Sequence, residues 1–159
     1  MAANTGVATS AGSTFHIVAA GAAPATFDAT GYAALAWVAV GEITDLGEFG
    51  REYSLVTHQA IGSRSTQKFK GSFNEGTINL QLGLQTDDAG QIICKAASIS
   101  DLAFSCKVTT QNGDVYYMRA MVMSFKVGVG SVDQITTAAV TLELTTNSAG
   151  VGIVEALQA

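Results

Sequence analysis

The chain has 159 residues, of which 48% are apolar and only 13% are charged, and its formal net charge is −5. This length suits one hydrophobic core, so we predict a single domain over residues 1–159. The acidic balance argues against a protein that grips nucleic acid through phosphate contacts, because such proteins concentrate Lys and Arg on one face. Charged residues are about half as frequent as in an ordinary soluble domain, which predicts that another molecule covers part of the surface.

Lipid is not expected to be that cover, because no apolar run approaches the ~18 residues of a spanning helix. The N-terminus lacks the basic start and apolar stretch of a secretory signal, so we expect the chain to begin in a cytoplasm. Cys94 and Cys106 have neither C-x-x-C spacing nor a neighbouring histidine. We therefore expect two buried thiols, without a disulfide framework or a metal site.

The first part of the chain predicts a flexible arm and two strands. Residues 1–14 are rich in Ala, Gly, Ser and Thr without any period, so they bury too little apolar surface to offset the entropy lost on ordering. A strand is predicted at 16–18 and a loop at 21–31, which holds the proline. The next strand, at 37–46, carries apolar residues on both alternating sets.

A long polar segment follows, in which the hydrophobic pattern weakens. Residues 47–70 mix Gly and Ser with half of the basic residues of the chain, namely Arg51, Arg64, Lys68 and Lys70. Loops longer than ~12–15 residues are uncommon inside a compact domain and tend to be functional or disordered. This predicted loop is therefore the best candidate for a working surface. Glu48 and Glu52 are expected to form exposed ion pairs with Arg51.

The following strand and helix have the most regular patterns. In residues 77–85, Ile and Leu alternate with uncharged polar residues, which predicts one buried and one polar face. Asp88 and Gln91 form a predicted capping box, in which the Asp oxygen accepts the N3 amide and the Gln side chain returns to the cap amide. A helix of about ten residues should follow and pack on the sheet. Gly90 should weaken this helix by up to ~1 kcal/mol.

The last part predicts a hairpin and a final strand. Asn112-Gly113 separates β-rich segments at 102–110 and 115–129, and both residues accept the positive φ of a type I′ turn. In the longer segment, large apolar side chains occupy both faces: Tyr116 and Met118 on one, and Tyr117, Met121, Met123 and Phe125 on the other. Neither face is therefore expected to lie in water. Residues 138–146 alternate again and predict the last strand. The tail at 147–159 has a weak apolar end that could dock on a neighbour.

No residue pattern predicts an enzyme. Catalysis would need a nucleophile with a base, tuned carboxylates or a metal set. His16 and His58 lack partners at a suitable spacing, while Glu42 and Asp45 fall on opposite faces of the predicted strand. The glycines do not form a phosphate loop, and aromatic residues are not interleaved with basic ones as in single-strand binding surfaces. We expect no enzymatic activity and no cofactor.

The order of these pieces resembles the major tail tube proteins of long-tailed, siphovirus-type bacteriophages. The resemblance covers roughly residues 30–146 and rests on the pattern between Gly41 and Gly90: a strand, a long loop, a second strand and a short capped helix. It implies a mainly β fold, sandwich-like or barrel-like, with one short α-helix packed on the sheet. It also implies a virion structural protein whose rings, typically hexameric, stack into the hollow tail tube through which DNA is ejected.

The resemblance implies roles for two sets of residues. The loop at 47–70 would make axial contacts with the next ring through Arg51, Glu52, Arg64, Lys68 and Lys70. The lumen would be lined by Glu42, Asn79, Gln81 and Gln85. An uncharged to acidic lining would let DNA slide past, because few cations would bind its phosphates.

The resemblance also implies partners and a location. The partners would be further copies of the chain and other tail proteins, namely the tape measure, tail terminator and distal tail proteins, with transient passage of DNA and no membrane. Assembly would take place in the host cytoplasm and the product would lie in the virion tail. Two alternatives stay open: a secretion-system inner-tube protein, which would share the ring, and a small ligand-binding β-barrel, which would stay monomeric. A small enzyme would reveal itself by a bound metal or a titrating histidine.

Overall fold

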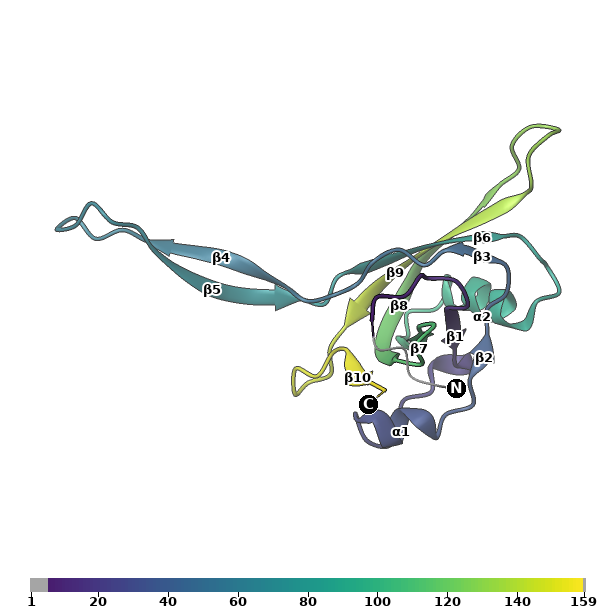
Figure 1. Ribbon diagram of the computed structural model, residues 1–159, viewed down its shortest axis with the longest axis horizontal. Helices are drawn as coiled ribbons and strands as arrows, with labels where there is room; N and C mark the ends of the chain where they lie inside the picture. Colours follow the sequence, from purple (N-terminus) through teal and green to yellow (C-terminus); the bar gives the residue numbers. More distant parts are fainter. Residues whose placement is uncertain (1–5, 159) are drawn as a thin grey trace.

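A computed structural model describes residues 6–158 as a curled antiparallel sheet with a long projecting hairpin (Figure 1). Within this range the large sheet has eight strands in the order β2-β1-β7-β8-β9-β6-β3, with β10 beside β8. The mainly β fold predicted from the sequence is confirmed. The strands of the large sheet are β1 (Thr14–Ile17), β2 (Val38–Ala39), β3 (Ile43–Asp45), β6 (Thr77–Gly83), β7 (Phe104–Thr109), β8 (Val115–Gly128), β9 (Thr137–Thr145) and β10 (Val154–Ala156).

The projecting hairpin consists of β4 (Glu52–His58) and β5 (Gln67–Asn74), which pair with each other. We call residues 51–74 the arm. The prediction of a loop throughout 47–70 is therefore wrong, because β4 and the first half of β5 lie within this segment. The sequence concealed these strands because neither has a buried face: every residue of β4 is exposed, and so is every residue of β5 except Gly71. Alternation between apolar and polar residues arises where one face is buried.

The core lies inside the curl of the large sheet, where α2 (Ala89–Ala97) packs against it (Figure 1). Ile78, Leu80 and Leu82 of β6 are fully buried, whereas Asn79 and Gln81 between them are exposed. This alternation was predicted. β9 also alternates as expected, with its apolar side chains in the same core.

Asp88 is the N-cap of α2, as predicted, because its Oδ2 accepts the N–H of Gln91 at 3.0 Å. The reciprocal half of the capping box is wrong. The buried Gln91 side chain instead accepts the N–H of Gln85 and donates to the carbonyl oxygens of Gly41 and Gly83. Gln91 thereby satisfies backbone groups between β2 and β3 and at the end of β6, which would be costly to bury unpaired. Gln85, whose N–H it accepts, lies beyond the end of β6.

The single strand predicted at 37–46 is interrupted. β2 ends at Ala39 and β3 begins at Ile43, and between them Glu42 has a positive φ of 59°, which a β-strand cannot contain. Gly90 of α2 presses against this break so closely that a Cβ there would collide with the carbonyl of Ala39. The glycine that weakens the isolated helix therefore allows the helix to approach the chain.

The segment between β1 and β2 covers one face of β7 and the start of β8. It contains η1 (Ala19–Gly21) and α1 (Ala29–Ala33), a short helical turn where the sequence predicted only loop. Tyr32 stacks on Tyr117 of β8, with ring centroids 5.3 Å apart, and Trp37 lies over the same ring at 5.8 Å. The expectation that neither face of the long strand lies in water thus holds for its first half only, because Met123 further along is 58% exposed.

The β7–β8 hairpin is confirmed, but its predicted turn type is wrong. Gly113 has a positive φ of 91° whereas Asn112 does not, and Thr110 donates its N–H to the carbonyl of Asp114 at 2.9 Å. These features belong to a three-residue loop with one left-handed position.

A bulge lies further along β8, at Met123. Val122 pairs with Leu142, and Ser124 pairs with the next residue of β9, Thr141, so Met123 is one extra residue on β8. Beyond it, Phe125 pairs with Val140 and faces the core side. The sequence interpretation had placed Phe125 on the same face as Tyr117, because it assumed an unbroken period of two.

The C-terminal tail folds back on its own chain. β10 pairs with residues 115–117 of β8, directly beyond the stretch of β8 that β9 occupies. Leu157 near the end of this tail stays 59% exposed, and docking of this end on a neighbour stays a prediction. At the other end, residues 6–13 of the N-terminal segment that was predicted to be flexible are irregular. Residues 1–5 of that segment lie outside the described residues. No helix in the described part of the chain is long and apolar enough to cross a membrane.

Candidate assembly surfaces

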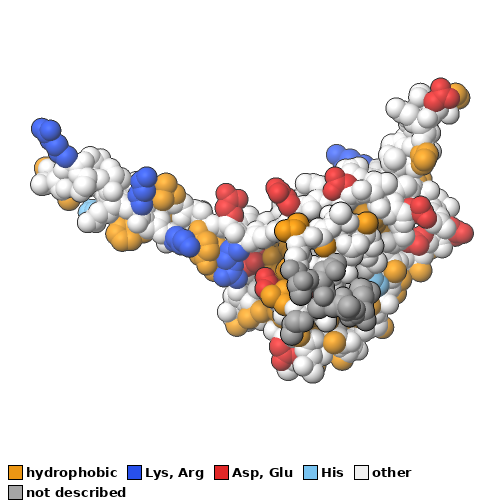
Figure 2. Space-filling view, viewed as in Figure 1, with side chains coloured by type: hydrophobic (Ala, Val, Ile, Leu, Met, Phe, Trp, Pro, Cys, Tyr) orange, Lys and Arg blue, Asp and Glu red, His pale blue; other side chains and the backbone are white. Residues whose placement is uncertain are grey.

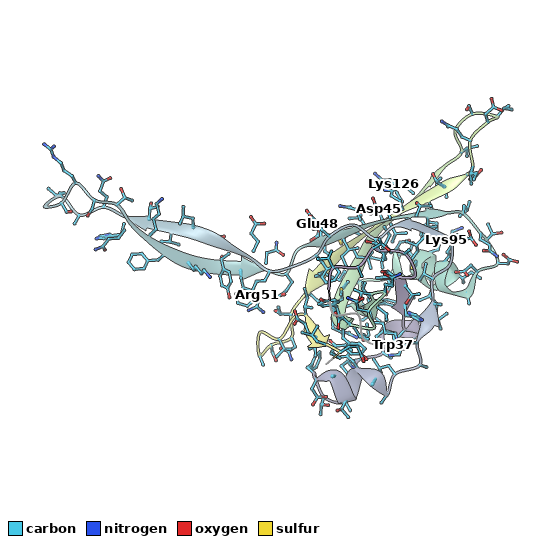
Figure 3. All side chains as sticks on the ribbon, viewed as in Figure 1. Trp37, Asp45, Glu48, Arg51, Lys95 and Lys126 are labelled. Atoms are coloured by element: carbon cyan, nitrogen blue, oxygen red, sulfur yellow. The ribbon has the colours of Figure 1, made fainter. Side chains whose placement is uncertain are left out.

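An ion pair between a buried carboxylate and a partly exposed guanidinium lies where the arm joins the large sheet. Glu75 is only 3% exposed, and its Oε1 accepts from Nε of Arg51 at 2.8 Å and lies 2.6 Å from Nη2 of the same guanidinium. The C-terminal segment closes over this carboxylate at Gly152, where a Cβ would collide with it. The predicted pairs of Arg51 with Glu48 and Glu52 are wrong: among residues 6–158, Glu75 is its ion-pair partner. Figure 3 shows Arg51 at the root of the arm.

Cations and aromatic rings alternate along the root of the arm. The guanidinium of Arg51 lies 3.9 Å from the ring centroid of Phe73, the rings of Phe73 and Tyr53 are 5.6 Å apart, and Nζ of Lys70 lies 4.7 Å from the centroid of Tyr53. Each cation–ring contact contributes about 0.5–1 kcal/mol at an exposed site. The interpretation that aromatic and basic residues are not interleaved is therefore wrong in space, because the two strands bring them together. These contacts stabilise the root of the arm, whose strands have no buried face.

The outer part of the arm exposes apolar side chains. Val56 and Phe69 face each other across the two strands and are 48% and 55% exposed, while Ile61 near the turn is completely exposed. Arg64 and Lys68 make no ion pair with any described residue. Exposed apolar residues on a projecting two-stranded ribbon mark an interaction surface, because such a ribbon is only marginally stable alone.

Charge is divided unevenly between the arm and the rest of the chain. The arm holds four basic residues and one acidic residue, a net charge of +3, whereas the remaining sequence holds four basic and twelve acidic residues, a net charge of −8. Figure 2 shows Lys and Arg spaced along the arm and Asp and Glu spread over the body. Two copies of the chain are therefore electrostatically complementary when the arm of one meets the body of the other.

The outer face of β6 and β9 is polar and largely uncharged. Asn79 pairs with Thr141, and Gln81 pairs with Ala139. At the end of this face, Thr77 donates its hydroxyl to Glu143 at 2.8 Å. Of the four residues that the sequence placed in the lumen, Asn79 and Gln81 share this face. Glu42 lies between β2 and β3, where its carbonyl accepts the N–H of Gly83 and its Cβ lies beside Gly83 on this side of β6. Gln85 lies beyond the end of β6.

Sequence reasoning missed the aromatic and apolar residues of the arm and its buried anchor. The missed residues are Tyr53, Leu55, Val56, Phe69, Phe73 and Glu75. A usable signal was present in Tyr53 to Thr57, which is rich in β-formers, and in the alternation of Lys and Phe at 68–70. Glu75 gave no signal, because its partner lies 24 residues away across a hairpin.

The buried titratable groups are part of the body and form no metal-binding cluster within residues 6–158. Cys94 and Cys106 are fully buried free thiols, as predicted, and burial raises the pKa of Cys94 to about 12. Burial also lowers the pKa of His16, and the nearby Lys107 lowers it further. Nδ1 of His16 has no hydrogen-bond partner in the structure. None of these groups faces a catalytic partner.

No protein-family model and no curated protein matches this sequence. Its fold is similar to that of a chain in the cryo-EM structure of the anti-feeding prophage (AFP) baseplate, six-fold symmetrised. The TM-score is 0.66 at 9% identity, over 90% of this chain and 95% of that one. It is also similar to a chain in the cryo-EM structure of an extracellular contractile injection system, the PVC sheath/tube terminator in its extended state. Here the TM-score is 0.62 at 9% identity, over 97% and 100% of the two chains. The chain therefore shares a fold, over nearly its whole length, with a chain of a prophage baseplate and with a chain of a contractile injection system.

Proposed function

We propose that this protein is a structural subunit of a phage-type tail, and that its copies form rings that stack into a hollow tube. The observation that carries the proposal is the arm, which projects from a packed body with exposed apolar side chains and a charge opposite to that of the body. A monomer gains nothing from such a projection, which is an aggregation hazard unless another molecule covers it. The fold shared with a baseplate chain and with a tube-terminator chain supports the same role.

In this proposal the arm makes the contact between successive rings. Arg64 and Lys68 lie on the exposed outer part of the arm and pair with carboxylates of the next ring. Glu52 pairs with a cation of the next ring. Arg51 and Lys70 pack on the aromatic side chains of Phe73 and Tyr53 in the same arm, so they mainly stabilise the conformation of the arm. The six-fold symmetry of the similar baseplate supports a hexameric ring. One similar structure is a prophage baseplate and the other is a contractile injection system, whereas the sequence resembles the tail tube proteins of siphovirus-type phages. The proposed tube-subunit role does not depend on whether the tail contracts.

The lumen in this proposal is lined by the outer face of β6 and β9. Neither β6 nor β9 carries a basic residue, and Lys126 of the adjacent β8 lies beside this face, where it pairs with Ala139. Passing DNA therefore meets few groups that hold its phosphates. Tape measure, terminator and distal tail proteins are the expected partners at the ends of the tube. A secretion-system inner tube would use the same surfaces. A ligand-binding barrel is less well supported, because α2 and apolar side chains fill the inside of the curl.

Assembly is tested with the full chain by light scattering on a sizing column and by negative-stain electron microscopy. We expect hollow rings or tubes whose amount grows with protein concentration. The variant Arg64→Glu/Lys68→Glu/Lys70→Glu should keep the circular dichroism of the folded monomer but lose tube growth. Lys126→Glu, which reverses an exposed cation of the body, is the control. A wild-type chain that stays monomeric at high concentration would refute the proposal. Normal tubes from the triple variant would show that the basic residues of the arm make no contact needed for tube growth.

The lumen face is tested with Gln81→Cys. A small maleimide should label this cysteine in monomers and in tubes, whereas a bulky polyethylene glycol maleimide should label it in monomers only. Cys94 and Cys106 are fully buried and should not react. Equal labelling of tubes by the bulky reagent would place Gln81 on the outside.

A further inference from the structure

A second projection extends from the body at the turn between β8 and β9 (Figure 1). Its end, residues 129–136, is here called the β8–β9 tip. Val132 and Ile135 are 98% and 81% exposed, and Asp133 lies between them in the sequence. The turn is closed by hydrogen bonds in both directions between Ser131 and Gln134. The tip is therefore a hydrogen-bonded turn that exposes two apolar side chains and one negative charge.

A small groove lies at the base of the same projection, between β8 and α2. It has a volume of about 90 Å³, and apolar side chains dominate its lining, among them Leu84, Ile92, Phe125 and Val127. Lys95 of α2 also lines it and makes no ion pair with any described residue. Figure 3 shows Lys95 on the α2 side of the projection and Lys126 on its other side. The groove has room for one aliphatic side chain beside a positive charge.

We propose that the β8–β9 tip of one copy docks in this groove of a second copy, with Val132 or Ile135 inserted and Asp133 facing Lys95. The tip and the groove are complementary in polarity, in size and in charge. β8 and β9 are paired without interruption from Ser124–Thr141 to Gly128–Thr137, and this ladder carries the tip away from the body (Figure 1). Val132 of the tip lies five positions after Val127 of the groove, a span of up to about 16 Å. The contact is therefore head-to-tail between copies.

This inference rests on the proposed assembly but concerns a contact separate from the arm. The arm is basic and projects from the opposite side of the body (Figure 1), whereas the tip is acidic. A single side chain in a small groove buries far less surface than a stable dimer interface needs. The contact therefore contributes through repetition around a ring, where each copy is held at both ends.

Charge reversal tests the proposed pair. Asp133→Lys and Lys95→Glu should each raise the protein concentration at which half of the chain assembles by roughly tenfold, because each places like charges opposite one another. The double variant should return to within about threefold of wild type, because it restores an opposite pair. Lys126→Glu, with the same charge change on the other side of the projection, should have no effect. Equal effects of Lys126→Glu and Lys95→Glu, or no recovery in the double variant, would overturn the inference.

Cross-linking tests the geometry directly. Two variants with one added cysteine each, Val132→Cys and Ile92→Cys, are mixed, assembled and treated with a short bis-maleimide. A cross-linked dimer should form in the mixture and be absent from either variant alone. Val132→Cys mixed with Leu55→Cys, in the arm, is the control and should give no dimer. Tubes that form normally without this cross-link would refute the tip contact and leave the tube function standing. A wild-type chain that never assembles would refute both.

Discussion

β5 and β6 follow one another in the chain and are nearly equal in length, yet they have opposite environments. β6 buries Ile78, Leu80 and Leu82 completely, whereas β5 buries none of its residues. β6 is specified by the core that its side chains complete. β5 is held by its pairing with β4, by cation–ring contacts and by the ion pair at the root. The comparison teaches that one chain can separate the residues that make it fold from those that make it assemble.

The largest expected effect is a core truncation, because it removes packing that the body cannot replace. Leu80→Ala should lower the free energy of unfolding by about 2–5 kcal/mol, measured by urea denaturation followed by tryptophan fluorescence. Leu55→Ala is the matched control in the arm, where the leucine is 66% exposed. It should change this free energy by less than about 0.5 kcal/mol. Similar losses from both variants would erase the distinction between the two regions.

Loss of the buried carboxylate at the root should have an intermediate effect. Glu75→Gln should cost about 1–3 kcal/mol, because Glu75 is the ion-pair partner of Arg51. Hydrogen exchange should quicken in β4 and β5 and stay slow in β6. Glu52→Gln removes an exposed carboxylate of the arm and should leave exchange unchanged. Faster exchange throughout the molecule would mean that Glu75 supports the body instead of the arm.

A smaller effect is expected from His16 in β1. Burial and Lys107 lower its pKa in the folded chain, so the unfolded chain takes up the proton more readily. Stability should be full above the usual histidine pKa of about 6.5 and should fall as the pH decreases below it. His16→Gln should flatten this dependence in urea midpoints measured between about pH 7.5 and 5, with His58→Gln in the exposed arm as control. An unchanged slope in His16→Gln would refute the assignment.

The smallest effect on stability should accompany a large effect on assembly. Phe69→Ser removes an exposed ring of the arm and should change the free energy of unfolding by no more than about 0.5 kcal/mol. Tube formation should nevertheless decline, because the apolar contact surface is lost. Val7→Ser, at a fully exposed apolar position outside the arm, is the control for assembly. Full tube formation by Phe69→Ser would show that the apolar face of the arm is not an interface.

The sequence predicted the parts of the fold that burial specifies. β6, β9 and the β7–β8 hairpin follow from alternation and turn residues that one can read locally. The arm could not be recognised in the same way, because its strands lack a buried face. The break at Glu42 depends on Gly90 of a distant helix, and the ion pair of Arg51 with Glu75 depends on how the arm joins the sheet. Local patterns do not report contacts of this kind.

The candidate site was predicted in outline only. The basic residues of segment 47–70 were recognised, but not their rigid support or the apolar side chains between them. Two of the four proposed lumen residues, Asn79 and Gln81, lie on one sheet face because β6 alternates as its sequence indicates. Glu42 lies in the break between β2 and β3 beside Gly83 of β6, and Gln85 lies beyond the end of β6, so neither belongs to a strand.

The extra residue at Met123 has a geometric consequence. Val122 and Ser124 already face consecutive residues of β9, so deletion of Met123 would leave every pair and every facing side chain in place. What would change is direction, since a bulge bends and twists its strand. In a ring closed through the β8–β9 tip, this bend sets the angle between neighbouring copies. One residue would then set the circumference of the ring, and with it the bore of the tube.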